Sequence, residues 1–214
     1  MRDRSVIVED EAWRRLLALG AARTFPPAST LLRQGDPPTH VLALTSGRVK
    51  VVRSSPDGDH LVLAVRGPGE ILGDYSVLGE DDRSATVIAV EVCHTSVVPA
   101  DRFLAFVRSS GLENDLLRHA MSRIRESEAW RAELSSLPAR TRLARTLLRF
   151  GAPLPEIGLD QTEIAGAAGL ARSTAAGELA YLREHGIVRT SRRRVVITDV
   201  AALRALAGSG RPNV

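Results

Sequence analysis

The chain has 214 residues, long enough for one large domain or two small ones, and 44% of them are hydrophobic. Only 4% are aromatic, so a core must consist mainly of valine, leucine, isoleucine and alanine. No apolar run approaches the roughly 20 residues that span a bilayer, and residues 1–10 lack the apolar segment of a signal peptide. The single cysteine, Cys93, excludes an internal disulfide and a multi-cysteine metal cluster, so a cytoplasmic protein is the simplest expectation.

The net charge of +4 is unevenly distributed along the chain. Residues 138–214 carry 12 arginines against 6 acidic residues, whereas residues 1–137 carry 17 basic and 19 acidic residues. A basic last third on a slightly acidic remainder indicates that the C-terminal part meets a polyanion. The number of arginines alone is weak support, because the chain has 28 arginines and one lysine, as a biased genomic base composition would also produce.

The first half of the chain has mostly strand patterns. Residues 11–20 have helical spacing and stop at Gly20. From Phe25 to Pro99, short runs rich in valine and leucine are separated by Gly, Pro, Asp and Ser, with a strong hairpin signal at 55–58 and a break at 67–69. Strand and turn signals at such close intervals predict a compact antiparallel barrel or sandwich.

Helical patterns follow. A short helix is expected from Asp101 to about Gly111, a long one from about Leu112 to Ser135, and a third over 139–150 before a Gly/Pro-rich loop at 151–159. The long helix carries an impure heptad seam, formed by Leu117, Ala120, Ile124, Ser127, Arg131 and Leu134. The seam fits either a helix docked on its own barrel or a dimer interface. We favour the dimer, because short helices already close the first domain, and expect a hinge at 136–138.

The clearest motif lies between residues 159 and 198. Asp160 can cap a helix that Gly169 breaks, and a second helix begins near Arg172 and ends at Gly186. An arginine-rich hairpin then predicts a wing. In a helix-turn-helix unit the second helix enters the major groove. The alternative is an arginine-rich protein-interaction module, and we favour DNA binding because the order, spacing and charge of these elements agree. The expected DNA contacts are Gln161, Thr162, Arg172, Ser173, Thr174, Arg192, Arg193 and Arg194.

The segments TSGRVKVV, GPGEILGD, RSATV and QTEIAGAAGLARSTAAGELAYL together resemble the cyclic-AMP receptor protein and fumarate-nitrate regulator (CRP/FNR) family of bacterial transcription factors, over about residues 15–200. The resemblance implies an α+β fold. An antiparallel β jelly-roll, a cyclic-nucleotide-binding-like effector domain, would occupy residues 1–111. A long dimerisation helix with its hinge would follow at 112–137, and a C-terminal winged helix-turn-helix DNA-binding domain at 138–214.

The resemblance also implies a phosphate-binding cassette in the turn before the RSATV strand. Arg83 would pair with the phosphate of a cyclic nucleotide, Ser84 would add a donor, and Asp74 would accept from the ribose with a side chain one methylene shorter than the family's glutamate. Ser127 and Glu128 would contact the purine from across the dimer. The alternatives are that Arg83 pairs only with its neighbours Asp81 or Asp82, and that Glu128 is solvated. The full set of expected effector contacts is Gly73, Asp74, Tyr75, Ser76, Arg83, Ser84, Ala85, Arg123, Ser127 and Glu128.

The implied function is that of a cytoplasmic, homodimeric, sequence-specific transcription regulator, not an enzyme. It would bind a palindromic DNA operator and contact RNA polymerase, and it would need neither a metal nor a membrane. Its effector would be a cyclic nucleotide, with cyclic AMP (cAMP) the first expectation and cyclic GMP (cGMP) the second. Rival functions are a regulator of the same fold that is ligand-independent or senses another effector, a nucleotide-gated enzyme, and a DNA-packaging protein.

Two departures from the family pattern affect the expected specificity and chemistry. Where the cyclic-AMP receptor proteins carry a glutamate and a second arginine on the recognition helix, this chain has Ser173 and Gly177, which predicts a different operator. The N-terminal region lacks the cysteines of an iron–sulfur sensor. Cys93 and His94 are adjacent in an expected strand, so they face opposite sides and cannot readily share a ligand.

Overall fold

The computed structural model describes residues 10–55, 60–151 and 155–208. The chain divides into two compact units, Met1–Glu126 (unit 1) and Ser127–Val214 (unit 2), and this boundary falls inside the longest helix. Among the described helices, none is both long enough and apolar enough to cross a membrane.

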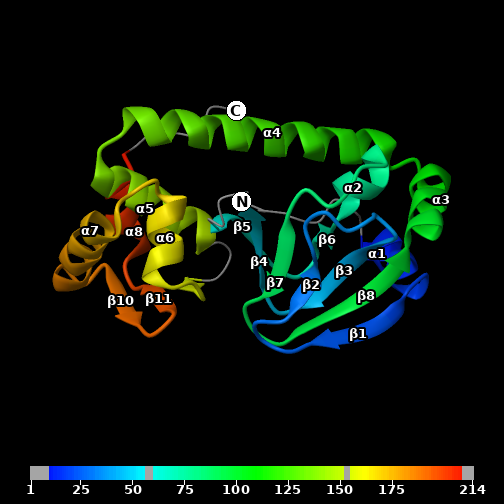
Figure 1. Ribbon diagram of the computed structural model, residues 1–214, viewed down its shortest axis with the longest axis horizontal. Helices are drawn as coiled ribbons and strands as arrows, with labels where there is room; N and C mark the ends of the chain where they lie inside the picture. Colours follow the sequence, from blue (N-terminus) through cyan, green and yellow to red (C-terminus); the bar gives the residue numbers. More distant parts are fainter. Residues whose placement is uncertain (1–9, 56–59, 152–154, 209–214) are drawn as a thin grey trace. The chain divides into compact units, whose positions relative to one another are not determined.

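Unit 1 is built around two four-stranded antiparallel sheets (Figure 1), with strand orders β1-β8-β3-β6 and β2-β7-β4-β5. This arrangement confirms the predicted antiparallel jelly-roll. The strands are β1 (Ala21–Phe25), β2 (Thr30–Leu32), β3 (His40–Ser46), β4 (Val49–Ser54), β5 (His60–Arg66), β6 (Ile71–Leu72), β7 (Thr86–Ala89) and β8 (Cys93–Pro99). The helices are α1 (Asp10–Ala18), α2 (Asp74–Gly79), α3 (Ala100–Ser110) and the first part of α4 (Glu113–Ser136).

Strand β3 contributes side chains to both hydrophobic clusters of the unit 1 core. Its central residues read VLAL rather than alternating apolar and polar side chains, because both faces of the strand are covered. Val41 contributes to a cluster with helices α1 and α3, where Leu16 and Phe103 are buried. Leu42 and Leu44 contribute to a second cluster with residues of the other sheet. The core of unit 1 therefore consists mainly of aliphatic side chains with a few phenylalanines, as the composition predicts.

The β4–β5 hairpin has the expected strand pairing. The two strands pair antiparallel up to Ser54 and His60, on either side of the predicted turn at 55–58. Most of that turn lies outside the described residues. The predicted break at 67–69 separates β5 from β6, and Gly69 adopts a φ of 90°, which favours glycine.

Unit 2 contains the predicted helix-turn-helix and wing. Helix α6 (Gln161–Ala167) and helix α7 (Arg172–Glu184) flank the turn, and strands β10 (Val188–Ser191) and β11 (Arg194–Ile197) form the wing hairpin. Asp160 accepts from the backbone N–H groups of Thr162 and Glu163, while the Glu163 side chain accepts from the Asp160 N–H, so the start of α6 is a complete capping box. Helix α5 (Ala139–Phe150) matches the expected helix over 139–150.

Two elements of unit 2 were not expected from the sequence. Strand β9 (Glu156–Ile157) lies inside the predicted Gly/Pro-rich loop and pairs with β11, so the wing sheet has the order β10-β11-β9. Helix α8 (Val200–Leu206) follows the wing and is capped by Asp199, whose side chain accepts from the Ala202 N–H. Both elements depend on partners distant in sequence, because two strand residues or a seven-residue helix have little stability alone.

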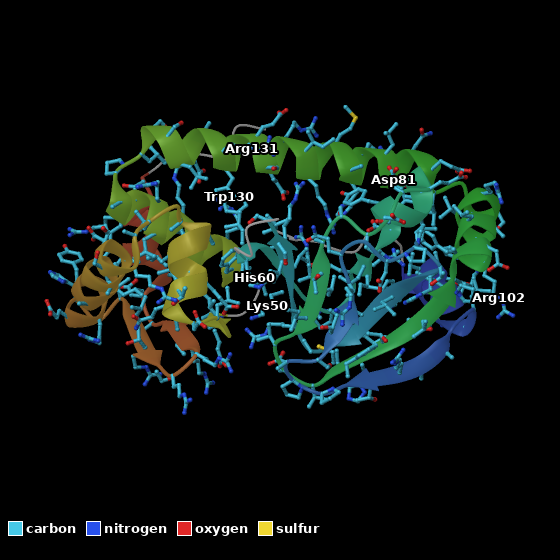
Figure 2. All side chains as sticks on the ribbon, in the orientation of Figure 1. Lys50, His60, Asp81, Arg102, Trp130 and Arg131 are labelled. Atoms are coloured by element: carbon cyan, nitrogen blue, oxygen red, sulfur yellow. The ribbon has the colours of Figure 1, made fainter. Side chains whose placement is uncertain are left out.

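The last part of α4, from Ser127 onward, packs on the rest of unit 2 through several polar contacts. Trp130 points from α4 toward α6 (Figure 2), and its Nε1–H donates to the Ala167 carbonyl at 3.1 Å. Glu133 forms ion pairs with Arg145 at 2.8 Å and Arg149 at 3.0 Å, both on α5. A Cβ added to Gly169 would lie 2.9 Å from Leu134 Cδ2, so the seam residue Leu134 is packed against the turn between the two helices of the motif.

Candidate nucleotide and DNA sites

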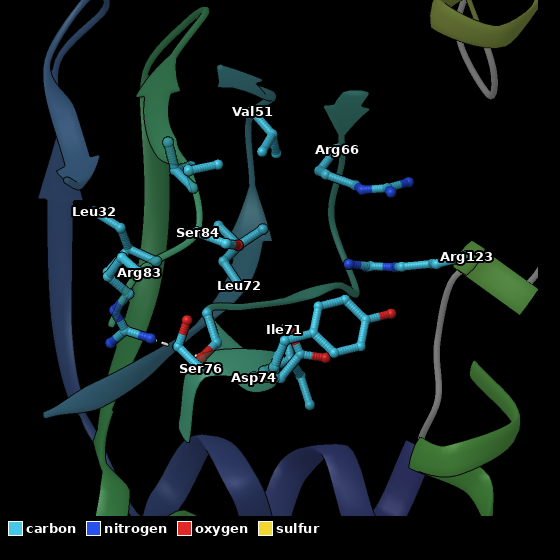
Figure 3. A pocket seen from close by; sticks show the side chains of 14 residues that line it. Leu32, Val51, Arg66, Ile71, Leu72, Asp74, Ser76, Arg83, Ser84 and Arg123 are labelled. Carbon is cyan, nitrogen blue, oxygen red and sulfur yellow. Dashed lines mark hydrogen bonds between the residues drawn. The ribbon is translucent and has the colours of Figure 1, made fainter. Parts of the chain in front are cut away.

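A cavity of about 80 Å³ opens in unit 1 beside helix α2. Its charged lining consists of three arginines and one acid, so the cavity wall is predominantly positive. Figure 3 shows Arg83 on one side of the cavity, with Arg66 and Arg123 on the other. The lining residues are Leu32, Val51, Arg66, Ile71, Leu72, Gly73, Asp74, Tyr75, Ser76, Arg83, Ser84, Ala85, Val87 and Arg123.

Most of the predicted effector contacts therefore surround one cavity. The lining as a whole brings together residues from β2, β4, β5, β6, α2, β7 and α4 that lie as much as 91 positions apart in the sequence, from Leu32 to Arg123. Ser127 and Glu128 are exposed on α4 and are not among the lining residues. Their predicted contact comes from a second copy of the chain, so it stays a prediction.

Arg83 is buried, with 4% of its surface exposed, and is held by backbone oxygens. Its Nη1 donates to the Gly73 carbonyl at 2.7 Å, and its Nη2 donates to the His40 carbonyl. The backbone is fixed as well, because the Arg83 N–H donates to the Asp36 carbonyl at 2.9 Å. Neither Asp81 nor Asp82 forms an ion pair with Arg83 among the described residues, so the alternative of a surface pair with these neighbours does not describe this structure.

Gly73 makes the position of Arg83 sterically possible. It adopts a φ of 80° at the start of α2, a conformation that side chains rarely allow. A Cβ at this position would lie 2.5 Å from Arg83 Nη1 and 2.9 Å from Leu32 Cδ1. A glycine therefore serves two purposes here: it permits the left-handed backbone, and it leaves space for the guanidinium beside its carbonyl.

Glu70 holds the two arginines on the other side of the cavity. Its Oε2 lies 3.3 Å from Arg66 Nε and 3.3 Å from Arg123 Nη2, and its Oε1 accepts from the Gly67 N–H. Arg123 also lies over the Tyr75 ring, with its guanidinium carbon 5.2 Å from the ring centroid. Arg123 lines the same cavity as Asp74, and its charge opposes the rise that burial causes in the pKa of that acid, although its ion pair is with Glu70.

Burial controls the protonation of the acids in this cluster. It raises the pKa of Asp74, which is 2% exposed, while Arg123 and the backbone N–H groups of Asp74 and Tyr75 oppose that rise. Burial also raises the pKa of Glu70, against the attraction of Arg66 and Arg123. Burial lowers the pKa of Arg83, and Asp36 and Asp74 partly compensate. A bound anion would compensate further for the desolvation of Arg83.

The hydroxyl groups of the cassette differ in accessibility. Ser84 is exposed at the cavity, as a phosphate donor requires. Ser76 is buried, and its Oγ donates to the Asp82 carbonyl at 3.3 Å, which ties the turn to α2.

The cavity volume is below the roughly 300–1,000 Å³ typical of pockets for drug-sized ligands, so a nucleotide would have to displace part of the lining.

Arg66 and Glu70 were absent from the sequence-based site. Glu70 stands within the quoted segment GPGEILGD, four residues before Asp74, and this second acid beside the expected one was the available signal. Arg66 ends strand β5, and nothing in its local pattern distinguishes it from a surface arginine. The ion pairs that join these residues to Arg123 become visible only in three dimensions.

The predicted DNA contacts of unit 2 lie at element ends and are exposed. Arg172, Ser173 and Thr174 form the exposed first turn of α7. Gln161 and Thr162 are exposed at the start of α6. Arg192 and Arg193 are exposed at the wing turn, where Arg193 has a φ of 57°. The third wing arginine, Arg194, is also exposed but forms an ion pair with Glu156 of β9, so part of its charge is compensated.

Helix α7 is held against α5 on the side away from its exposed first turn. Arg140 Nε donates to Glu178 Oε2 at 2.7 Å, and the Arg140 guanidinium carbon lies 3.5 Å from the Tyr181 ring centroid. Ala175, Leu179 and Leu182 are buried. These contacts fix the helix orientation and leave its N-terminal side chains free to approach DNA.

Cys93 and His94 lie on opposite faces of β8, as predicted. The Cys93 thiol is buried and donates to the carbonyls of Arg48 and Glu91, whereas His94 is exposed and hydrogen-bonds to Thr24. Burial raises the pKa of the Cys93 thiol, which keeps it in the unreactive form. In the described part of the chain, no group of three or more His, Cys, Asp or Glu side chains could hold a metal ion.

Comparison with known proteins agrees with this division of the chain. Residues 22–110 match the model of the cyclic nucleotide-binding domain, and residues 141–206 match that of the Crp-like helix-turn-helix domain. The "Cyclic AMP receptor protein" of Thermus thermophilus is 31% identical over 188 residues, which cover 86% of this chain and 87% of that protein. The "CRP-like cAMP-activated global transcriptional regulator" of Mycobacterium tuberculosis is 26% identical, with coverage of 82% and 83%.

Solved structures show the same relationship. A CRP-family transcriptional regulator from Thermus thermophilus matches with a TM-score of 0.69 and 28% identity, over 87% of this chain and 97% of that one. The match extends through both the β-sheet unit and the helix-turn-helix unit. The chain therefore belongs to the CRP/FNR family of transcription regulators, with a cyclic nucleotide-binding domain followed by a Crp-like DNA-binding domain.

Proposed function

We propose that this chain is a homodimeric transcription regulator whose affinity for DNA is controlled by a cyclic purine nucleotide bound in the unit 1 cavity. The observation that carries the proposal is the lining of that cavity, where three guanidinium groups accompany one carboxylate. Such a lining attracts an anion, and a carboxylate beside it suits the hydroxyls of a sugar. The names of the two bacterial relatives make cAMP the first nucleotide to test.

The proposed binding mode follows the two sides of the cavity. The phosphate would bind beside Arg83 and Ser84, and the ribose would bind near Asp74. Two of the five N–H groups of the Arg83 guanidinium donate to backbone oxygens, so the remaining N–H groups would form the charge-assisted bond to phosphate. Ser127 and Glu128 of the partner copy would complete the purine pocket.

Self-association is proposed from one face of α4. Leu117 and Ile124 are each 58% exposed and Met121 is 49% exposed, although all three are large and apolar. Their spacing of four and three residues places them on the same helix face. A second copy is the proposed occupant of that face, because two parallel α4 helices would also carry two DNA-binding units. In this assembly residues 1–111, 112–137 and 138–214 would be the effector, dimerisation and DNA-binding parts.

The DNA target is proposed to be a palindromic operator. Two recognition helices related by a two-fold axis bind half-sites about 34 Å apart, one turn of the duplex. Arg172 would read guanine, while the wing arginines would contact phosphates. Contact with RNA polymerase, a cytoplasmic location and the absence of enzymatic activity belong to the same proposal, since the relatives are transcription regulators.

Calorimetric titration of the purified chain with cAMP and cGMP tests the ligand part of this proposal. The wild type should bind at least one of them, and Arg83→Ala should lose that binding while its circular dichroism spectrum stays native. Arg53→Ala, which removes an exposed arginine from β4, is the matched control and should bind as the wild type does. Unchanged affinity in Arg83→Ala would contradict the assignment of the phosphate site. Absence of binding in the wild type would favour a ligand-independent regulator.

A further inference from the structure

Arg66 gives the cavity a second positive side that the expected phosphate site does not explain. The residue ends β5 and lines the cavity together with Arg123. One carboxylate, that of Glu70, is shared between the two guanidinium groups, each at 3.3 Å. Burial and the nearby charge of Arg123 both lower the pKa of Arg66. Two arginines with one shared carboxylate leave a local excess of hydrogen-bond donors.

The position of Arg66 relative to Arg83 indicates which part of a nucleotide it would meet. In Figure 3 the two arginines lie on opposite sides of the cavity, with Ser84 and Leu72 between them. A nucleotide with its phosphate at Arg83 and its ribose near Asp74 would extend its base toward Arg66 and Arg123. The ion pair of Arg66 with Glu70 is formed through Nε, and in Figure 3 the guanidinium points away from Arg83, so the side chain would have to turn for its two Nη groups to reach a base.

The chemistry of guanidinium restricts the base. Arginine carries only hydrogen-bond donors, in a planar fork. The N7 and O6 atoms of guanine are two adjacent acceptors that match this fork, whereas adenine presents an acceptor at N7 and a donor amino group at position 6. An adenine amino group facing Arg66 would place donor against donor. The arginine pair at this end of the cavity therefore favours a 6-oxopurine.

We propose that Arg66 makes the cavity selective for cyclic nucleotides with a 6-oxopurine base, so that cGMP and cyclic inosine monophosphate (cIMP) bind more tightly than cAMP. This inference rests on the proposed cyclic-nucleotide site and changes its first expected ligand. The comparison of cGMP with cIMP also distinguishes two residues that could recognise guanine, Arg66 and Glu128. Arg66 would read O6 and N7, which guanine and hypoxanthine share, whereas Glu128 of a partner copy would accept from the guanine N1–H and 2-amino group, and the base of cIMP lacks the 2-amino group.

Calorimetric titration of the full chain with cGMP, cIMP and cAMP tests the proposal. A well-formed bidentate contact predicts that cGMP and cIMP bind roughly 10- to 100-fold more tightly than cAMP. Equal or tighter binding of cAMP would overturn the role of Arg66 and leave the cyclic-nucleotide site intact. Tight binding of cGMP with weak binding of cIMP would also overturn it, because the 2-amino group would then be the selected feature. Binding of none of the three would contradict the proposed function itself.

Variants at position 66 provide a second measurement. Arg66→Gln supplies one donor and one acceptor, the pattern that matches adenine N7 and N6, and should reverse the preference toward cAMP. Arg66→Lys keeps a positive charge near Glu70 but loses the planar fork, so the preference for 6-oxopurines should fall by roughly threefold or more. Arg53→Gln is the exposed control and should keep the wild-type order of ligands. An unchanged order in folded Arg66→Gln or Arg66→Lys would contradict the proposal.

Discussion

Arg83 depends on the backbone around it as much as on its own charge. Two carbonyl oxygens accept from its guanidinium, and the glycine that supplies one of them has a positive φ. The guanidinium is therefore positioned before any ligand arrives, which reduces the entropy lost on binding. A ligand would use the N–H groups of Arg83 that these two backbone contacts leave available. At the residue scale, selectivity between nucleotides depends on which N–H donors of the cavity have no acceptor. Among the described residues Arg83 donates to two backbone carbonyls, whereas Arg66 forms an ion pair with Glu70 alone.

His119 should make the stability of unit 1 depend on pH. It lies half-buried on α4, and its Nε2 has no hydrogen-bond partner among the described residues. Burial, followed by the charges of Arg123 and Arg66, lowers its pKa from 6.5 to about 4. Between about pH 6.5 and pH 4 the unfolded chain therefore binds a proton that the folded chain resists, so this residue lowers stability as the pH falls.

The change due to His119 should be about 1 kcal/mol, after allowance for solvent screening of a half-exposed group. Glu70 and Asp74 have raised pKa values and act in the opposite direction, so the difference between variants is the informative quantity. Urea unfolding at pH 7 and pH 4.5 should show a smaller loss for His119→Gln than for the wild type. His60→Gln, which removes an exposed histidine from β5, is the control. Equal losses in wild type and His119→Gln would refute this interpretation.

Helix α4 joins two kinds of contact in one element. Its first part supplies Leu116 to the unit 1 core and Arg123 to the cavity. Its last part supplies Trp130 and Glu133 to unit 2. The heptad pattern predicts that all six seam positions lie in the dimer interface. Leu134, however, packs against Gly169 within unit 2. The exposed apolar face is therefore concentrated between Leu117 and Ile124.

A charge on that face should prevent self-association. Ile124→Glu places a carboxylate in the proposed apolar contact, where burial of an unpaired charge is strongly unfavourable. Sedimentation velocity should give a dimer for the wild type and a monomer for this variant at the same concentration. Arg125→Glu, at the next exposed position on the helix, should remain a dimer. A dimeric Ile124→Glu would show that another surface joins the copies.

Local patterns predict the elements of this protein better than they predict its site. Gly111 and Gly186 adopt positive φ values near the ends of α3 and α7, where the sequence places the stops. By contrast, β9 is two residues long and forms because β11 pairs with it. The same distinction holds in the cavity. Arg83 and Asp74 belong to a short segment with a known family role, whereas the Glu70–Arg123 pair spans 53 positions and has no local signature.

The whole molecule combines a positively lined cavity with an exposed basic DNA-binding surface in the same chain. At this scale Arg172 should determine sequence preference, since the other small or short side chains near it leave few base-reading groups. Arg172→Ala should weaken binding to a selected operator by roughly 5- to 150-fold, the value of one bidentate base contact, with little effect on random duplex. Arg193→Ala should weaken both duplexes by a similar factor, because a phosphate contact carries no sequence information.

Competition gel shifts with a selected operator and a random duplex measure these effects. If Arg172→Ala lost affinity equally for both duplexes, the arginine would not be a base reader. A wild type without any sequence preference in a binding-site selection would instead indicate a DNA-packaging protein.

The most direct test of the account is the operator affinity of the wild type with and without saturating cyclic nucleotide, measured by fluorescence anisotropy at fixed salt concentration. If the nucleotide prefers the DNA-binding arrangement, affinity should rise by about 5- to 150-fold, the usual range of an allosteric coupling. The same nucleotide should leave the operator affinity of Arg83→Ala unchanged. An operator affinity of the wild type that is identical with cGMP, with cAMP and without nucleotide would contradict the claim that the cavity controls DNA binding.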